Sequence, residues 1–480
     1  MIHDLKAYPA YKDSGVPWLG RVPEHWTTKP LKRWVRINAA VLPETTLPQC
    51  EFRYLDIGAV ETGFLTRRPC MLRFEGSPSR ARRIVRKGDT IVSTVRTYLK
   101  AVYFVADDAE DLICSTGFAV LTPQLATLPK FVSYLVQSSP FTDRVTADSV
   151  GIAYPAIAES RLGSFNVVVP PLPEQGAIVR FLNHYDRKIR RYIRGKQKSA
   201  KLLDEERLAI IHRAVTRGLD PNVRLKHSGV GWLGDVPEHW QIAQVRSVAQ
   251  VVRGGTPRPA GSPVYFHGDA EPWITVGELT KDRDMYLCST ATRLTAVGVE
   301  RSRTVLPGTL LLTNSGATLG VPKITMIRGC INDGVAAFLR VHPEVNKEYL
   351  YFFWTTQTPH LRAWVDLGAQ PNLNTQIIGG WPVPMPPPLE QQAIADWVGS
   401  HAHGVTRSVD AVQREIGLLR EHRTRLIADV VTGKLDVREA AARLPEEAEG
   451  PEPLDEDEAL SVADEEPADD LDATPREAGV

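Results

Sequence analysis

The chain has 480 residues, of which 43% are hydrophobic and 24% charged, so we expect a soluble globular protein of two or three domains. No apolar run approaches the roughly 18 residues that a membrane span needs, and residues 1–10 hold no secretion signal. The five cysteines are widely spaced and never paired as Cys-x-x-Cys, which argues against a disulfide frame or a zinc site. These features predict a cytoplasmic protein with no membrane partner.

The overall net charge of zero conceals two oppositely charged parts. Residues 437–480 hold 16 acidic residues against three arginines, a local charge of −13. Residues 1–436 hold 54 Lys or Arg against 41 Asp or Glu, a charge of +13. A basic body with an acidic tail is typical of a nucleic-acid binder. We expect residues 437–480 to be a disordered, solubilising tail, and favour this over a tail that competes with DNA for the basic surface.

A tryptophan-containing motif lies near the start of the chain and returns 214 residues later. Residues 14–26 read SGVPWLGRVPEHW and residues 228–240 read SGVGWLGDVPEHW, so only two of 13 positions differ. We call this segment the tryptophan motif; its tryptophans are Trp18, Trp26, Trp232 and Trp240. A match of this kind does not arise by chance, so the chain is an internal duplication.

A variable region of roughly 150 residues follows each tryptophan motif. Both copies contain short β-rich runs bounded by Gly or Pro, which predict strands. These runs are 53–58, 89–93 and 117–121 in the first copy, and 273–277, 308–313 and 334–339 in the second. Helical patterns at 129–137 and 348–356 make each region a mixed α+β domain.

A proline-rich motif ends each variable region. Residues 170–178 read PPLPEQGAI and residues 386–394 read PPPLEQQAI, and these copies are 216 residues apart. Prolines followed by an acidic residue suit a helix start, because the positive end of the helix dipole favours carboxylates. The residues at this predicted start are Glu174 and Gln175 in the first copy, and Glu390 and Gln391 in the second.

Apolar residues then recur near a seven-residue period, which predicts a long coiled-coil helix in each copy. The period is imperfect, since Lys196, His401 and Arg423 occupy apolar positions. About 40 helical residues would extend roughly 60 Å. The offset of 216 persists to the helix ends, so this part of the repeat tolerates no net insertion.

The predicted fold class is α+β, with two mixed α/β domains separated by two long helices, an internal repeat and a disordered acidic tail. The predicted boundaries are 1–170 for the first domain, 171–220 for the first long helix, 221–386 for the second domain, 387–436 for the second long helix and 437–480 for the tail.

The sequence carries none of the common catalytic motifs. It has no phosphate-binding P-loop, no His-Glu-x-x-His, no Gly-x-Ser-x-Gly and no Asn-Pro-Pro-Tyr or Asp-Pro-Pro-Tyr. His25 and His239 lie in the tryptophan motifs, where packing in a turn is favoured over a metal or acid–base role. We therefore predict no catalytic residue and no metal site.

Binding-type residues remain in the predicted loops of both variable regions. Arginine and lysine can contact phosphates, and Asn, Arg, Ser and Thr can read base edges, although Asn-Asp-Gly and Ser-Gly also form ordinary turns. The DNA-binding candidates are Arg67, Arg68, Arg82, Arg83, Arg96, Tyr98, Lys100, Ser115 and Thr116 in the first region, and Asn314, Ser315, Thr318, Asn332, Asn372 and Asn374 in the second.

The two tryptophan motifs, the two proline-rich motifs and the doubled plan resemble the specificity subunit of Type I restriction–modification enzymes. The resemblance covers residues 1 to about 436 and leaves only the acidic tail outside. It implies that each variable region is a target recognition domain for half of a bipartite double-stranded DNA site, and that the two helices lie antiparallel as a spacer. Because the two variable regions differ in sequence, we expect an asymmetric site.

The resemblance also implies partners. Two methyltransferase subunits and the motor–nuclease subunits would bind this chain, and they would carry S-adenosylmethionine, ATP and Mg²⁺, so this chain itself would have no cofactor and no catalytic activity. The matched motif residues would have structural and subunit-docking roles; they are Trp18, Trp26, Trp232, Trp240, Glu174, Gln175, Glu390 and Gln391. The recognised bases cannot be transferred by motif.

Two other classes of protein stay open. One is a coiled-coil scaffold that never contacts DNA, which the basic body disfavours. The other is an uncharacterised enzyme such as a nuclease, which would show magnesium-dependent cleavage by the purified chain alone.

Overall fold

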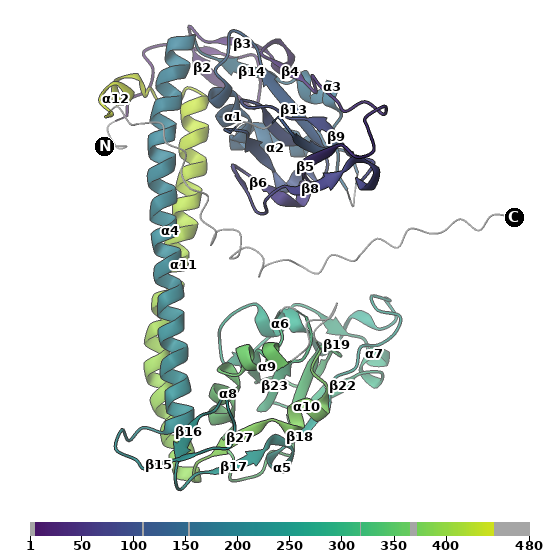
Figure 1. Ribbon diagram of the computed structural model, residues 1–480, viewed down its shortest axis with the longest axis vertical. Helices are drawn as coiled ribbons and strands as arrows, with labels where there is room; N and C mark the ends of the chain where they lie inside the picture. Colours follow the sequence, from purple (N-terminus) through teal and green to yellow (C-terminus); the bar gives the residue numbers. More distant parts are fainter. Residues whose placement is uncertain (1–4, 108–109, 152–153, 317, 365–371, 446–480) are drawn as a thin grey trace, which may run out of the picture. The chain divides into compact units, whose positions relative to one another are not determined.

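The computed structural model describes residues 5–107, 110–151, 154–316, 318–364 and 372–445. The chain divides into two compact units, residues 1–194 with 416–480 (unit 1) and residues 195–415 (unit 2). Each unit contains one variable region, which we call a head, and one half of each of two long helices, α4 (Leu172–Arg217) and α11 (Pro388–Val431). The elements are labelled in Figure 1.

The head of unit 1 is built on two four-stranded sheets. The first has the order β11-β10-β13-β4 and is antiparallel; its strands are β4 (Val35–Ile37), β10 (Thr90–Ser93), β11 (Val102–Phe104) and β13 (Phe118–Pro123). The second has the order β8-β5-β12-β9; its strands are β5 (Glu51–Leu55), β8 (Cys70–Arg73), β9 (Ala81–Ile84) and β12 (Leu112–Ser115). Within it, β5 and β12 run parallel.

Strand β10 separates two hydrophobic cores because its side chains alternate between the faces of the sheet. Val92 belongs to the core that also contains helix α1 (Pro129–Gln137) and the beginning of α4. Ile91 belongs to the core shared with Leu55 of the second sheet. The remaining elements of this unit are β1 (Tyr11–Asp13), β2 (Arg21–Pro23), β3 (Thr27–Pro30), η2 (Leu31–Arg33), η3 (Ile57–Ala59), β6 (Val60–Glu61), β7 (Phe64–Leu65), η4 (Phe74–Gly76), η5 (Thr97–Leu99), α2 (Ser139–Ala147), α3 (Glu159–Gly163), β14 (Asn166–Val169) and α12 (Arg438–Ala442).

The head of unit 2 repeats this plan. Its first sheet has the order β18-β26-β23-β24-β20, with β18 (Gln250–Arg253), β20 (Tyr286–Leu287), β23 (Thr309–Thr313), β24 (Pro322–Thr325) and β26 (Val335–Leu339). Its second has the order β21-β19-β25-β22, with β19 (Phe266–Ile274), β21 (Arg293–Leu294), β22 (Arg303–Val305) and β25 (Gly329–Ile331). The remaining elements are β15 (Leu225–His227), β16 (Asp235–Pro237), β17 (Gln241–Gln244), α5 (Val245–Val248), α6 (Val276–Thr280), α7 (Ala296–Glu300), α8 (Lys347–Thr355), α9 (Thr358–Trp364), α10 (Thr375–Gly380) and β27 (Pro382–Met385).

The two heads share one strand order, apart from the additional edge strand β20 in unit 2, although their sequences differ. Strand β23 alternates as β10 does, with Leu310 in the core that contains α8 and Leu311 in the core of the second sheet. The parallel pair β19–β25 matches the parallel pair β5–β12. The duplication therefore extends through both variable regions, beyond the segments where sequence identity reveals it.

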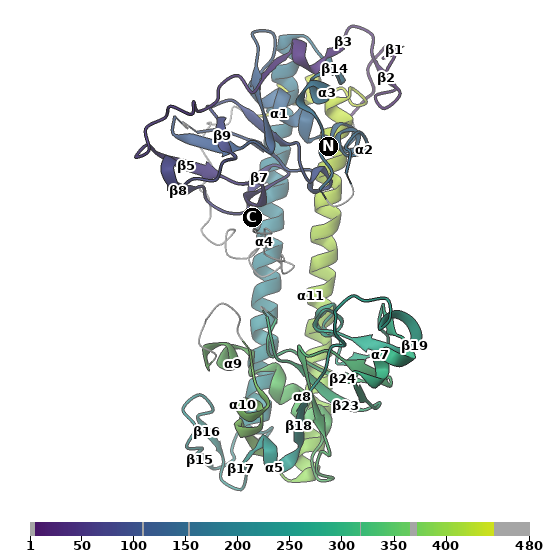
Figure 2. The same cartoon turned by 90° about the vertical axis from the view of Figure 1, so that its right-hand side faces the viewer.

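The two long helices run antiparallel within each unit. In unit 1 the beginning of α4 packs on the end of α11, since Ile178 and Leu182 share a core with Leu426 and Val430. In unit 2 the end of α4 packs on the beginning of α11, since Val215 shares a core with Ile394 and Val398. Both views show α4 and α11 side by side (Figures 1 and 2).

The predicted α+β class, internal repeat and pair of long antiparallel helices are confirmed. The predicted domain boundaries stay predictions. The predicted disordered tail falls mostly on residues 446–480, outside the described residues. The first residues of the tail were predicted to be disordered but form helix α12, which buries Ala441 against the core of unit 1.

Candidate nucleic-acid interface

In unit 1, the connection from β10 to β11 combines exposed binding-type side chains with a constrained backbone. Arg96 and Lys100 flank η5 and adopt φ angles of 51° and 52°. Residues other than glycine seldom occupy this left-handed region, and such backbone strain concentrates at functional sites. Tyr98, between them, is 52% exposed. A bridge between Val95 and Ala156 holds the loop in place.

The charges of this loop have partners within unit 1. The guanidinium of Arg96 lies 4.9 Å from the ring centroid of Tyr154. The ammonium of Lys100 lies 2.5 Å from a carboxylate oxygen of Asp143. Stacking orients Arg96, and the exposed pair of Lys100 with Asp143 contributes little free energy, so both side chains stay candidates for contact with an anion.

The turn between β12 and β13 places its two candidate residues differently. Ser115 is fully buried, and its hydroxyl accepts a hydrogen bond from the Gly117 amide at 3.2 Å. Thr116 is exposed, and its amide donates to the Arg80 carbonyl at 2.8 Å. Ser115 therefore shapes the turn, and Thr116 is the residue that can reach a ligand.

The candidate arginines of unit 1 do not form one cluster. Arg83 is only 18% exposed and pairs with Glu159. Arg82 lies over the ring of Phe74, 4.8 Å from its centroid. Arg67 and Arg68 are exposed in the connection between β7 and β8.

In unit 2, loops at the ends of the central strands bring several asparagines together. The Leu373 amide donates to the Asn314 carbonyl at 2.7 Å, and Ser315 forms a bridge with Asn372. The side-chain oxygens of Asn314 and Asn332 are buried, and neither has a hydrogen-bond partner among the described residues. Because buried polar atoms are nearly always paired, these two amide oxygens need donors that the described side chains do not supply, such as an internal water.

Three basic and polar side chains surround Asp333, next to this asparagine cluster. Arg253 donates to the Asp333 carbonyl at 2.7 Å, Thr256 donates to its carboxylate at 2.6 Å, and Arg258 pairs with it at 3.1 Å. Burial raises the pKa of Asp333, but the Thr256 hydrogen bond and the two arginines outweigh it and hold this pKa below its usual range. Arg253 and Arg258, which the sequence analysis did not single out, are thus held beside the cluster.

Two of the predicted residues in unit 2 have local structural roles. The Asn374 side chain caps α10 by accepting a hydrogen bond from the Ile377 amide at 2.8 Å. The Thr318 carbonyl accepts from the Thr313 hydroxyl at 2.6 Å within a turn.

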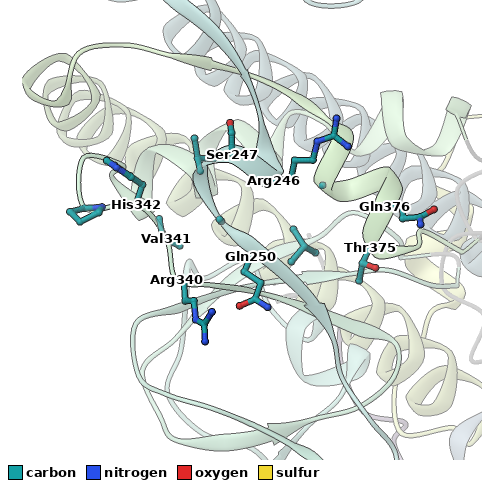
Figure 3. A pocket seen from close by; sticks show the side chains of 13 residues that line it. Arg246, Ser247, Gln250, Arg340, Val341, His342, Thr375 and Gln376 are labelled. Atoms are coloured by element: carbon teal, nitrogen blue, oxygen red, sulfur yellow. The ribbon is translucent and has the colours of Figure 1, made fainter.

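An open hollow of about 870 Å³ lies at the opposite end of β18 from the asparagine cluster. Arg246, Arg340 and His342 line it together with Gln250 and Gln376, and none of the described residues that line it is acidic (Figure 3). Its chemistry suits an anion such as a phosphate group.

In unit 1, the tryptophan motif clamps the start of α4 and the end of α11. The Trp26 indole is fully buried and donates to Glu174 Oε1 at 3.0 Å, while His25 Nε2 lies 2.8 Å from Glu174 Oε2. Gly433, just after α11, has φ +77°, and an added Cβ would lie 2.4 Å from Pro23. The Gln175 side chain accepts from the Leu128 amide and donates to two carbonyls of the head.

Unit 2 contains the same clamp with one hydrogen bond fewer. His239 lies 2.8 Å from Glu390, and Gln391 accepts from the Asn346 amide at 2.8 Å. The Trp240 indole is buried but its N–H has no hydrogen-bond partner among the described residues. Trp18 and Trp232 are partly buried against the cores of their units. The motif residues thus hold each head on the helix ends, and their docking role stays a prediction.

The comparisons with known proteins agree on one family. The Type I restriction modification DNA specificity domain matches residues 80–200 and 237–402, more than half of the chain. The chain belongs to this family of DNA specificity subunits. The HindI specificity subunit of Haemophilus influenzae is 22% identical to it over 329 residues, which cover 57% of this chain and 71% of that relative.

One further relative and one solved structure are similar to this chain. The putative MjaX specificity subunit of Methanocaldococcus jannaschii is 18% identical over 289 residues, covering 59% of this specificity subunit and 62% of that relative. A structure solved in work on complex assembly and conformational transition of the type I R-M system has 23% identity and a TM-score of 0.61. It covers 86% of this specificity subunit and 99% of that chain, which supports the fold.

The specificity subunit holds its first head on the helices through a partly buried charge cluster that sequence reasoning missed. Asp186 of α4 pairs with Arg423 of α11 and, at 2.9 Å, with Arg190. Arg190 also donates to the Gly63 carbonyl in the β6–β7 connection at 3.1 Å. Burial lowers the pKa of the nearby Lys130 to about 8, although the Asp186 carboxylate opposes this shift. The signal in the sequence was Arg423, a charge in an apolar helix position.

We predict that Asp186→Asn lowers the free energy of unfolding of the specificity subunit by about 1.5–3 kcal/mol, because it removes the carboxylate that pairs with the partly buried Arg423 and Arg190. Burial raises the pKa of Asp186, but Arg423 and Arg190 outweigh it, so the folded pKa is lowered. The stabilisation is therefore present above the unfolded pKa and is lost as pH falls through the folded pKa. Urea unfolding from pH 7 down to pH 3 measures both effects. The exposed Asp410→Asn is the control, and an equal loss in both variants would contradict the prediction.

We also predict that the two clamps differ in strength. Glu174→Ala leaves the buried Trp26 N–H without an acceptor and should lower the free energy of unfolding by about 1–3 kcal/mol. Glu390→Ala removes only the contact with the half-exposed His239, so less than about 1 kcal/mol should be lost. Parallel denaturant titrations measure the difference, and a larger effect in the Glu390 variant would refute the assignment.

No helix within the described ranges combines the length and apolar character needed to cross a membrane.

Proposed function

We propose that this specificity subunit reads an asymmetric bipartite DNA site, with one head on each half-site. The observation that carries the proposal is that two heads of closely similar strand order present different loop chemistry. Unit 1 offers Arg96 and Tyr98, whereas unit 2 offers Asn332 and Asn372. Arginine pairs best with guanine and asparagine with adenine, so two unlike half-sites follow.

The two heads also offer contacts to the DNA backbone. Arg67, Arg68 and Arg82 of unit 1 are exposed or half-buried at the surface, and Arg246 and Arg340 line the open hollow of unit 2. Such contacts give affinity that depends on salt and not on base sequence. The loop residues then supply specificity, and the arginines supply the greater part of the binding free energy.

The long helices have the second role in this proposal. A helix rises about 1.5 Å per residue, so 46 residues in α4 and 44 in α11 set the spacer between half-sites.

Two methyltransferase subunits dock on the helices and the clamps, and motor–nuclease subunits join them. S-adenosylmethionine, ATP and Mg²⁺ belong to these partners, and the specificity subunit itself performs no chemistry. In the part of the chain that the structure describes, no group of three metal-ligating side chains occurs.

DNA binding by the methyltransferase–specificity complex tests the proposed reading residues. We predict that Arg67→Ala weakens binding about tenfold and reduces the slope of log affinity against log salt by about one, as the loss of a phosphate contact does. Asn332→Ala should instead cost about 1–3 kcal/mol of discrimination at one base pair and leave the salt slope unchanged.

Titration of labelled duplexes at several salt concentrations measures both quantities. The control is Arg224→Ala, an exposed arginine outside both loop clusters. Equal effects of all three substitutions would contradict the assignment. Cleavage of DNA by the purified chain with Mg²⁺ alone would contradict the non-catalytic role.

A further inference from the structure

One loop is closed by the same main-chain hydrogen bonds in both heads. It runs from the end of β10 to β11 in unit 1 (residues 93–101) and from the end of β23 to β24 in unit 2 (residues 313–321). In each loop the first amide donates to the last carbonyl, and the seventh amide donates to the fourth carbonyl. The third residue of each loop also forms a bridge, with Ala156 before α3 or with Asn372 before α10. The two loops therefore correspond position by position.

Two positions of this loop have a left-handed backbone in both heads. In unit 2 they are occupied by Gly316 and Gly320, with φ angles of 79° and 90°. In unit 1 the same positions carry Arg96 and Lys100, with φ angles of 51° and 52°. Glycine adopts this conformation readily, whereas a residue with a side chain is strained in it. Unit 1 thus keeps two side chains in strained positions, and such strain concentrates at functional sites.

Between these two positions, the tip of the unit 1 loop exposes apolar side chains. Tyr98 is 52% exposed and Leu99 is 45% exposed. The equivalent residues of unit 2 are the polar Thr318 and the fully buried Leu319. Within the described residues of the two loops, the exposed apolar tip is therefore a feature of unit 1.

The tip of the unit 1 loop is anchored to the rest of the head. Thr97 is buried, and its hydroxyl donates to Ser149 Oγ at 2.8 Å. Its carbonyl accepts from the Thr146 hydroxyl at 3.1 Å, and the Lys100 carbonyl accepts from the Thr62 hydroxyl at 2.6 Å. Side chains on an anchored loop lose less conformational freedom on binding, which favours affinity for a ligand.

A second exposed ring lies beside this loop. Tyr154 is 60% exposed, and the Arg96 guanidinium stacks on it. Exposed aromatic rings next to basic side chains are the combination that binds bases by stacking and the strand by charge.

We propose that Tyr98 and Leu99 form a wedge that enters the base stack of the half-site bound by unit 1, with Arg96 and Lys100 contacting the DNA on either side. This inference rests on the proposed function and states how one head engages its half-site. Apolar side chains that enter a base step partly unstack it and bend the duplex. Pyrimidine–purine steps open most easily, so this half-site should contain or adjoin such a step. Unit 2, without the wedge, should leave the stack of its half-site closed.

Energy transfer between dyes at the two ends of a duplex tests the wedge, because a bend brings the ends together. At saturating concentration, the wild-type methyltransferase–specificity complex should bend the duplex. The double variant Tyr98→Ala/Leu99→Ala should bend it less and bind about tenfold more weakly, as the loss of one stacked base does. Both side chains are exposed, so their removal leaves no cavity in the head.

Two further variants make the test specific. Tyr98→Phe keeps the ring and should retain both the bend and the affinity. Thr318→Ala, at the position of unit 2 that corresponds to Tyr98, is the matched control and should behave as the wild type does. Bases turned out of the duplex by the methyltransferase subunits also distort DNA, but this distortion does not depend on Tyr98 and is common to all variants.

The other outcomes overturn the inference. If the double variant binds more weakly but bends the saturated duplex as the wild type does, the tip contacts DNA without entering the stack. If it keeps both the bend and the affinity, the tip does not contact DNA at all. Both results leave the proposed function intact. If the wild-type complex binds no DNA sequence selectively, the proposed function fails, and the wedge fails with it.

Discussion

Exchange of residues 30–165 for the corresponding segment of a relative should replace one half of the recognised sequence and leave the other half unchanged. The boundaries fall at the end of β3 and just before β14, an antiparallel pair that stays with the helices. The second-sheet cores of this head lie wholly within the exchanged segment. The contact of Arg190 with the head goes to the main chain of Gly63, so it survives a change of side chain.

Methylation mapping in cells that contain the exchanged chain and the methyltransferase measures this result. We expect complete loss of the original first half-site, the appearance of the donor's half-site, and no change of the second. A recognition sequence altered in both halves would show that the heads are not independent readers.

Removal of seven residues from each long helix should shorten the spacer between half-sites by one to three base pairs. Residues 196–202 of α4 and 409–415 of α11 face each other, since Lys196 pairs with Glu415 at 2.6 Å. Seven residues correspond to about 10 Å of helix, equal to about three steps of 3.4 Å along DNA if helix and DNA axes are parallel, and fewer if they are inclined. A heptad nearly preserves the rotational phase of the packed faces.

Selection of bound duplexes from a library with spacers of varied length measures the change. A paired insertion of seven residues is the matched control and should lengthen the spacer. Removal of seven residues from α4 alone should instead destabilise the chain, because the two ends of the helix pair cannot then both keep their register, and either the Asp186–Arg423 pair or the packing of Val215 on Ile394 is lost. An unchanged spacer in the paired deletion would refute the spacer role of the helices.

The repeat and the long helices could be predicted because their signals are local and periodic. The polar residues at apolar positions of the heptad pattern also form specific contacts. Lys196 pairs with Glu415 and Arg423 pairs with Asp186, so these charges join the two helices. His401 stacks on Trp397 at the helix surface. A charge in an apolar helix position was thus a sign of a specific contact.

The binding site was less accessible to sequence reasoning, because residue type does not separate a ligand contact from a turn. Ser115 and Asn374 have the right chemistry to read bases, yet one is buried in a turn and the other caps a helix. Arg253 and Arg258 are recognised as candidates only through their contacts with Asp333, about 80 residues away in the chain. Such contacts depend on strand pairing that local patterns do not encode.

The most direct test of the central claim is methylome sequencing of cells that contain this chain and its methyltransferase subunit. Two half-sites of different sequence separated by a gap of fixed length are the expected result, and the gap should change only when the helices change. A single continuous or palindromic methylated sequence, or no methylation that depends on this chain, would contradict the claim that two unlike heads on paired helices read the DNA.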